Sequence, residues 1–177
     1  MNEIKTIYSI GHSTLSIEEF LKRLNAYKIK QIADVRRFPG SAKYPWFNKE
    51  NFELLLAEHD INYSHIELLG GRRKADKDSS NTVWKNKSFQ GYADYMENPE
   101  FLKGIDILLK FSAGKPTAMM CSEAVWWRCH RSMISDYLKS IGIKVIHIMA
   151  ENNSKEHTYT KPAKIIEGKL FYGRVED

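Results

Sequence analysis

The chain has 177 residues, 42% of them hydrophobic and 28% charged, which is the length and composition of one ordinary globular domain. Its net charge of +5 suits an anionic partner without requiring one. The apolar runs are too short for a transmembrane helix, and the N-terminus lacks the features of a secretion signal, so we expect a cytoplasmic protein with no membrane partner and two free or ligating cysteines.

Strands and amphipathic helices alternate from the beginning of the chain. TIYSIG is a short apolar run that predicts a buried strand at 6–11. Ser16 and Glu19 then form a capping-box pattern, which predicts the start of a helix with one apolar face. The next expected elements are a strand at 31–36, an irregular segment at 38–47, a helix at 48–60 and a strand at 62–70.

The same alternation returns after a polar segment. Residues 71–98 are expected to form an ordered loop with short helical turns around 89–96. Asn98 and Pro99 are typical of a helix start, and Gly114 can end that helix. The remaining elements are a strand at 116–121, a helix at 129–142, a strand at 144–149 and, at 163–173, either a small hairpin or a loosely docked tail.

This order of elements predicts an α/β fold. We expect one domain over 1–177, a three-layer α/β/α sandwich around a mostly parallel sheet of about five strands. Its core would cover 6–149, and 150–177 would form a C-terminal extension. Ligand sites in such sheets form at the carboxyl ends of the strands. Four unusual segments follow strands there, namely GHS, DVRRFPGS, LGGRR and CSEAVWWRCHR, so we expect them to meet in one pocket.

The fourth segment contains both cysteines. Cys121 ends a strand, whereas Cys129 and His130 lie at the expected start of a helix, where free N–H groups favour a thiolate. Either sulfur is a candidate nucleophile, and Glu123 or His130 is a candidate proton carrier. The sequence does not choose between the two cysteines. Each can also be an inert buried residue, or the two can form a redox-sensing pair.

A metal site is a competing interpretation of the same residues. Cys121, Cys129 and His130, with His12 or His147 from neighbouring strand ends, offer the nitrogen and sulfur ligands that zinc prefers. However, the C-x7-C-H spacing matches no familiar zinc module, and adjacent cysteine and histidine side chains seldom face one metal. The sequence therefore identifies no cofactor.

Basic and hydroxyl side chains in the four segments predict an anion-binding pocket. Guanidinium groups bind phosphate or carboxylate in a bidentate manner, and the two glycines of LGGRR allow close approach of the backbone. Asp34 and Arg36 either belong to this pocket or form an ion pair that organises the loops. The predicted substrate-binding residues are His12, Ser13, Asp34, Arg36, Ser41, Arg72, Arg128 and Arg131.

Aromatic residues lie near these arginines in the sequence. Rings beside arginines can stack a base over a neutralised phosphate, which favours a nucleotide or nucleic-acid ligand. The alternative is a small secondary core under a long loop. The residues concerned are Trp46, Phe47, Trp84, Phe89, Tyr92, Tyr95, Trp126 and Trp127. The expected partner is thus an anionic small molecule or a nucleic acid.

Together, YSIGHS, IADVRRFPGS, LGGRR, FQGYADYM and MCSEAVWWRCHRSMISDYL, followed by VIHI, resemble the bacterial family DUF488, a domain of unknown function. The resemblance spans residues 6–149 and implies a compact α/β domain, but no established activity. The sequence departs from the family motif at Ser122 and Trp126, where the family more often has alanine and proline.

These observations lead to three hypotheses. The first is an enzyme acting on a phosphate-bearing or nucleobase-containing substrate, in which arginines bind the anion and a thiolate attacks. The second is a non-catalytic nucleic-acid-binding protein that uses the same basic and aromatic surface. The third is a metal-binding or redox-sensing Cys/His site. The sequence does not indicate an oligomeric state.

Overall fold

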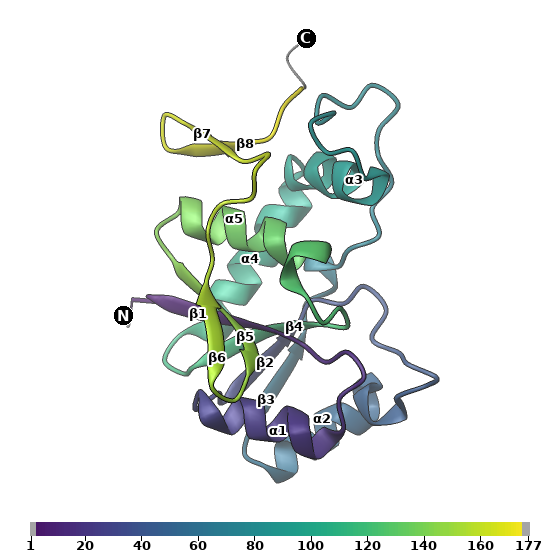
Figure 1. Cartoon of the computed structure of the whole chain (residues 1–177), viewed down its shortest axis with the longest axis vertical. Helices are drawn as coiled ribbons and strands as arrows, with labels where there is room; N and C mark the ends of the chain where they lie inside the picture. The colour runs from purple at the N-terminus through teal and green to yellow at the C-terminus, as the bar shows by residue number, and fades with distance from the viewer. Residues whose placement is uncertain (1–2, 175–177) are drawn as a thin grey trace.

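The computed structural model describes residues 3–174 and contains a six-stranded sheet between two layers of helices (Figure 1). The strand order is β3-β2-β4-β1-β5-β6, and every pair is parallel except the last. The strands are β1 (Thr6–Gly11), β2 (Gln31–Asp34), β3 (Asn62–His65), β4 (Thr117–Cys121), β5 (Lys144–Ala150) and β6 (Asn153–Glu156). The predicted α/β sandwich is confirmed, with one strand more than the expected five, because β6 was not predicted.

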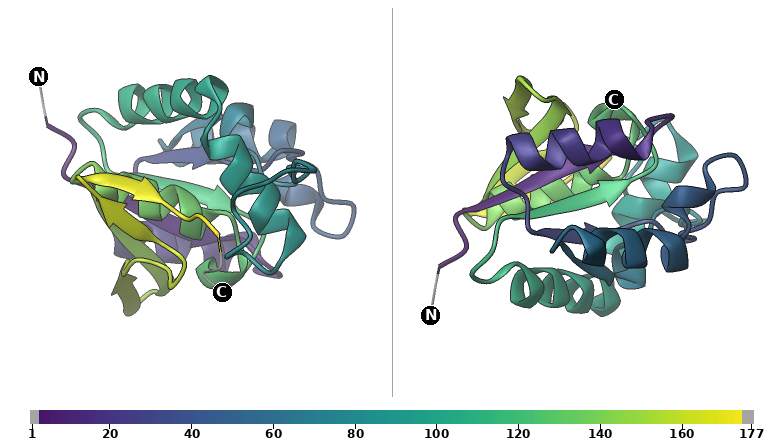
Figure 2. Two further views of the ribbon diagram at one scale, coloured as in Figure 1. Left: turned by 90° about the horizontal axis from the view of Figure 1, so that it is seen from above. Right: turned by 90° about the horizontal axis from the view of Figure 1, so that it is seen from below.

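Helices cover both faces of the sheet (Figure 2). On one side lie α1 (Ile17–Ala26) and α2 (Lys49–Glu58), and on the other α3 (Lys87–Met96), α4 (Pro99–Ser112) and α5 (Arg131–Ser140). Among residues 3–174, no helix combines the length and apolar character that crossing a membrane requires.

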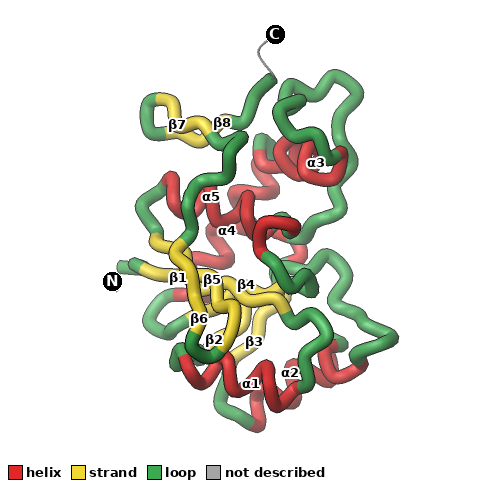
Figure 3. The backbone as a smooth tube through the Cα atoms, in the orientation of Figure 1, coloured by secondary structure: helices red, strands yellow, loops and turns green. Residues whose placement is uncertain are grey.

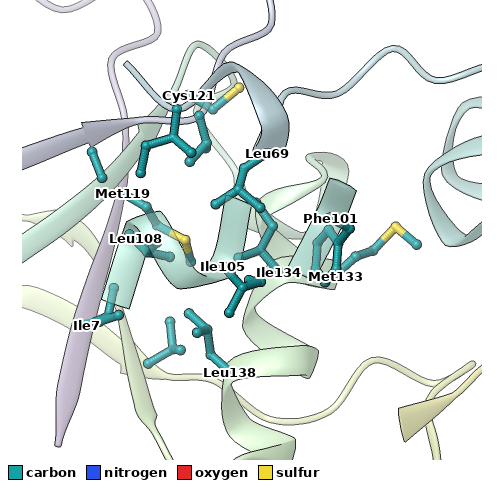
Figure 4. Packing of buried hydrophobic residues seen from close by; sticks show 14 of the residues in the cluster. Ile7, Leu69, Phe101, Ile105, Leu108, Met119, Cys121, Met133, Ile134 and Leu138 are labelled. Carbon is teal, nitrogen blue, oxygen red and sulfur yellow. The ribbon is translucent and has the colours of Figure 1, made fainter. Parts of the chain in front are cut away.

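Successive residues of β4 point to opposite faces, as strand geometry requires. Ala118 and Met120 pack with the cluster under α1 and α2, whereas Met119 and Cys121 belong to the cluster under α4 and α5. Figure 4 shows Cys121 at the end of this second cluster, above Met119 and beside Leu69. The pleat of β4 therefore decides that Cys121 faces the layer from which α5 comes.

The predicted helix starts are correct where a capping residue marks them. Ser16 and Glu19 form the reciprocal capping box of α1, and the Asn98 side chain accepts a hydrogen bond from the Glu100 N–H at the start of α4. The helix over 87–96 was predicted only as short turns. Its cap, Asn86, accepts hydrogen bonds from the N–H groups of Ser88 and Phe89 and was overlooked.

Three predicted boundaries were wrong near the strand ends. β2 ends at Asp34 and β3 at His65, so each strand is shorter than its apolar run. Irregular backbone follows β2, and a 3-10 turn takes the place of the predicted strand after β3. The helix expected from Cys129 begins at Arg131 instead. The 3-10 turns are Pro45–Phe47, Glu67–Leu69 and Trp126–Arg128.

The C-terminal extension forms the predicted hairpin, so the alternative of a loosely docked tail was wrong. Strands β7 (Lys164–Ile166) and β8 (Lys169–Phe171) pair antiparallel. Glu167 and Gly168 both have positive φ, 51° and 77°, as a tight two-residue hairpin turn requires. The tube in Figure 3 shows the hairpin at the end of the molecule occupied by α3 and α5.

Gly91 in α3 is expected to be essential for packing. Glycine inside a helix normally costs about 1 kcal/mol relative to alanine. A Cβ here, however, would lie 2.0 Å from the Arg73 carbonyl oxygen and 2.7 Å from the Ala75 nitrogen, both backbone atoms. We expect Gly91→Ala to lower the free energy of unfolding by about 1–3 kcal/mol, measured by urea denaturation. Gly40→Ala, whose Cβ would come no closer than 3.9 Å to Asn48, is the matched control, and a more stable Gly91→Ala variant would contradict the expectation.

Candidate active site

The segments that follow β2, β3 and β4 meet at the carboxyl edge of the sheet (Figure 3). A cavity of about 330 Å³ opens there, with residues of α3 completing its wall. Seven of the residues predicted from sequence line this cavity: Arg36, Arg72, Cys121, Glu123, Arg128, Cys129 and His130. Arg37 and Phe38 also line it and were not predicted. The position of Phe38 in a loop, between an arginine and a proline, could have indicated an exposed ring at the site.

The other predicted substrate-binding residues lie elsewhere. His12, Ser13 and Ser41 line a neighbouring hollow, which shares Gly40 and Ser122 with the main cavity. Ser41 Oγ accepts a hydrogen bond from the Tyr44 N–H at 3.0 Å, so this hydroxyl shapes its own loop. The remaining two, Asp34 and Arg131, are buried, with exposed fractions of 0% and 2%.

Three electron-pair donors converge on one wall of the cavity. Ligating atoms of Cys121, Cys129 and His130 all lie within 4.8 Å of one another, and Cys129 Sγ is 3.6 Å from His130 Nδ1. His130 Nε2 lies 2.8 Å from the Val35 carbonyl oxygen, which can only accept, so Nε2 carries a proton. For the neutral ring, the lone pair of Nδ1 therefore faces the sulfur atoms. Gly71 permits this arrangement, since a Cβ there would lie 2.9 Å from Nδ1.

Arg131 places a fixed positive charge beside Cys129. Its Nε donates to Cys129 Sγ at 3.5 Å, one terminal nitrogen donates to Ser9 Oγ at 2.9 Å, and the other donates to the Glu123 carbonyl oxygen. Gly11 allows the close approach of Glu123, because a Cβ there would overlap that carbonyl oxygen. All three arms of the guanidinium group are thus used inside the protein.

The two thiols have opposite electrostatic environments. Burial raises the pKa of the Cys129 thiol, but a hydrogen bond from Cys121 and the charge and N–H groups of Arg131 outweigh it and lower the pKa to about 6. The hydrogen bond to Cys129, reinforced by burial, raises the pKa of Cys121 to about 12. At neutral pH, Cys129 is therefore the thiolate and Cys121 is its donor. The Arg131 backbone N–H, the first of α5, contributes as the helix-start argument predicted.

The same three donors have the chemistry of a zinc site with one open position. A histidine whose second nitrogen binds a backbone carbonyl is typical of such ligands. The two additional predicted ligands do not join the cluster. His147 uses both ring nitrogens, toward Ser9 and His157, and His12 uses Nδ1 toward the Ser13 carbonyl and Nε2 toward Arg36. Arg131 already places a positive charge beside Cys129, so the protein's own side chains stabilise a thiolate there.

Asp34 and Arg36 form a buried ion pair beneath the second segment. Nε and one terminal nitrogen of Arg36 reach the Asp34 carboxylate, the shorter distance being 2.7 Å, and that terminal nitrogen also donates to the Phe47 carbonyl oxygen. The Tyr63 hydroxyl adds a hydrogen bond to Asp34. Burial and the carboxylate both raise the pKa of Tyr63, so its hydroxyl stays a donor. This pair organises the loop that carries Arg37 and Phe38.

Most of the aromatic residues singled out from sequence are packed inside the protein. Tyr92, Phe47 and Trp126 are buried, and Trp126 stacks on His147 with ring centroids 4.3 Å apart. Trp127 is 52% exposed but does not line the cavity. The ring most available to a ligand is Phe38, which is 62% exposed at the cavity rim. Phe89 and Tyr92, two of the predicted aromatic residues, also line the cavity, so its aromatic wall is small and fits a small molecule better than a series of stacked bases.

A family model described as a domain of unknown function, DUF488, matches residues 16–138. The chain belongs to the DUF488 family. No curated protein and no solved structure gives a significant match. The DUF488 match contains both cysteines, His130 and Arg131, and it ends before His147 and the C-terminal hairpin.

Proposed function

We propose that this DUF488 protein is a thiol-dependent enzyme acting on a small phosphate-bearing molecule, with Cys129 as the nucleophile. The proposal depends mainly on one observation. Cys129 Sγ lies at the wall of a cationic cavity and accepts hydrogen bonds from Arg131 and Cys121, both of which favour the thiolate.

The cavity itself supports a small anionic substrate. A volume of about 330 Å³ is at the lower end of the range for small-molecule sites and accommodates one compact ligand. Arg37, Arg72 and Arg128 line it, and none of the three forms an ion pair with any residue between 3 and 174. Their charge is available for a phosphate group, with which guanidinium groups form bidentate hydrogen bonds.

The chemical step uses groups on the cavity wall. The Cys129 thiolate attacks phosphorus, an Sγ–P bond forms, and the P–O bond to the leaving group breaks as Glu123 gives its proton to the departing oxygen. Water then attacks phosphorus and returns a proton to Glu123. Inorganic phosphate leaves, and Cys129 is again a thiolate, which the Cys121 S–H group stabilises. Glu123 receives this role because it is the carboxylic acid among the residues that line the cavity.

Hydrolysis of 4-nitrophenyl phosphate tests the assignment. We expect Cys129→Ser to abolish turnover, and Arg72→Ala or Arg128→Ala to raise KM by about 10-fold or more, the effect of losing one charge-assisted hydrogen bond. Lys74→Ala is the control, because Lys74 is an exposed cation close to Arg72 that does not line the cavity. Inorganic phosphate should also protect wild-type Cys129 from iodoacetamide.

Three outcomes would contradict the proposal. Turnover that survives Cys129→Ser would exclude the nucleophile. One equivalent of zinc in the purified protein, with both cysteines resistant to alkylation until a chelator removes it, would show a metal site. Steeply salt-dependent binding of single-stranded nucleic acid, unchanged in Cys129→Ser, would favour a non-catalytic binding protein.

A further inference from the structure

Beneath Arg131, a continuous chain of buried polar side chains crosses the protein. Ser9 Oγ receives the Arg131 guanidinium and lies 2.9 Å from His147 Nδ1. His147 Nε2 lies 2.9 Å from His157 Nδ1, and His157 Nε2 lies 2.8 Å from Asp136 Oδ1. None of the five residues is more than 2% exposed. The chain begins and ends on α5, at Arg131 and Asp136.

The two ends of this chain fix the direction of its outer hydrogen bonds, and one consistent direction then runs through the middle. A guanidinium only donates and a carboxylate only accepts. His157 therefore donates from Nε2 to Asp136. With one proton on each ring, His157 accepts at Nδ1 from His147, which in turn accepts at its own Nδ1 from the Ser9 hydroxyl. In this arrangement each polar atom of the chain has a hydrogen-bond partner. Burial lowers the pKa of His147 well below its usual value, in agreement with a neutral ring.

Three further residues fix the far end and the middle of the chain. The Thr160 N–H and hydroxyl and the Tyr172 hydroxyl all donate to the Asp136 carboxylate. The Trp126 ring stacks on His147 with an interplanar angle of 3° and shields it from solvent. Strand pairing places Ser9 opposite His147 in the sheet. The C-terminal segment thus reaches, through Asp136 and the histidines, to the residue that contacts Cys129.

We propose that Ser9, His147, His157 and Asp136 are positioning residues that hold the Arg131 guanidinium against Cys129 Sγ. The inference rests on the proposed function, since it concerns how the nucleophile is kept ionised. A buried N–H group without an acceptor is costly, and Ser9 supplies the acceptor for the guanidinium arm opposite Glu123. Asp136, five residues further along the same helix, supplies a buried negative charge at the far end of the chain.

Other titratable groups also face Cys129 and have to be kept constant in a test. They are Cys121 at the end of β4, His130 in the adjacent segment, and Tyr92 from α3, whose hydroxyl donates to the Leu69 carbonyl oxygen at 2.8 Å. None of them contacts Ser9 or His147 by a hydrogen bond, so substitutions in the chain act on Cys129 through Arg131.

The test measures the pH profile of Cys129 alkylation by iodoacetamide, followed by mass spectrometry of the Cys129 peptide. Ser9→Ala removes the hydroxyl that holds Arg131, and His147→Leu interrupts the chain at its centre. We expect both variants to raise the midpoint of the Cys129 alkylation profile by about one pH unit, which corresponds to a change of about 10-fold in the thiolate fraction at low pH. His147→Gln, whose amide can accept from Ser9 and donate to His157, should restore the wild-type midpoint.

Ser135→Ala is the matched control. Ser135, on α5, is 0% exposed, as is Ser9 on β1. The Ser135 hydroxyl donates to the Arg131 carbonyl and is not part of the chain of polar side chains. A loss of thermal stability with an unchanged midpoint in Ser9→Ala would reduce the chain to a structural role and overturn the inference. If His147→Leu fails to fold, Ser9→Ala alone decides. An ordinary midpoint in the wild type would instead overturn the proposed function, so the two failures are distinguishable.

Discussion

Alkylation of Cys129 by iodoacetamide is expected to titrate with a midpoint near pH 6, far below an ordinary thiol. The cause is that burial of this sulfur is outweighed by the Cys121 hydrogen bond and by Arg131, which lower its pKa to about 6. Cys121, with its pKa raised to about 12, should remain unreactive across neutral pH in the same experiment. The measurement is the second-order rate constant for each cysteine-containing peptide between pH 4 and pH 10.

The expected rate advantage depends strongly on pH. At pH 6 about half of Cys129 is thiolate, against about 0.1% of a thiol of pKa 9. A thiolate of lower pKa is also a weaker nucleophile, by about 20-fold over this range, so the net advantage at pH 6 is about 20-fold. Above pH 9 Cys129 should react more slowly than an ordinary cysteine. The pH–rate profiles of Cys129 and of an ordinary cysteine should therefore cross, which a difference in solvent accessibility alone would not produce.

Two substitutions provide the controls for this titration. Cys121→Ala removes the S–H donor and Arg131→Gln removes the positive charge, so each should move the midpoint upward. Ser135→Ala should leave it in place. A wild-type midpoint between pH 8 and pH 9 would contradict the assignment of Cys129 as the thiolate.

The same shifts affect folding stability in opposite directions. Cys129 has a lowered pKa in the folded state, so between about pH 6 and pH 9 the unfolded chain binds the extra proton and stability rises with pH. The contribution is complete above the unfolded pKa and is lost as pH falls through 6. Cys121 has a raised pKa, so between about pH 9 and pH 12 its contribution declines. The combined contribution of the two thiols should therefore be largest near pH 9.

Asp34→Ala is expected to cost about 3–5 kcal/mol of unfolding free energy, the largest stability effect among the substitutions proposed. Arg36 would then be buried, 5% exposed, without its carboxylate partner, and the Tyr63 hydroxyl would lose its acceptor. Breaking one partner of a buried pair leaves an uncompensated charge, which is why the expected loss exceeds the net value of the pair. Urea denaturation with matched m values is the measurement.

A double-mutant cycle sharpens this result. Asp34→Ala combined with Arg36→Met should be more stable than Asp34→Ala alone, because the buried charge is removed. Glu100→Ala is the exposed control, since Glu100 and Lys103 are 44% and 64% exposed and their pair should contribute less than about 1 kcal/mol. A loss below 1 kcal/mol in Asp34→Ala would show that water reaches Arg36 and that the pair does not organise the loop.

The errors of the sequence-based predictions have identifiable physical causes. The helix over 87–96 was predicted only as short turns because its apolar residues are interrupted by Gln90 and Gly91, and Asn86 was not recognised as its cap. β6 was missed because all four of its residues are exposed and polar, so no alternation marks it. The strand at 62–70 ended early because Leu69 packs into the core from a 3-10 turn. A buried apolar residue gives the same sequence pattern in a strand and in a 3-10 turn.

Several properties follow from the sequence alone. Alternating apolar runs and capped amphipathic helices determined the α/β sandwich, because such patterns depend on residues that are close in the chain. The strand-end positions of DVRRFPGS, LGGRR and CSEAVWWRCHR placed seven of the predicted site residues around one cavity, because parallel strands bring their carboxyl ends to one edge.

Only the tertiary structure distinguished the two cysteines. The pKa of a thiol depends on burial and on partners within a few ångströms, and for Cys129 these include Arg131, which Ser9 holds from a strand more than a hundred residues away in the chain. For the same reason, no local pattern indicated that His157 lies beneath the site, and His147, expected as a possible metal ligand, instead bonds to Ser9 and His157. Local periodicity determined where the site forms, and long-range contacts decided which of its groups is ionised.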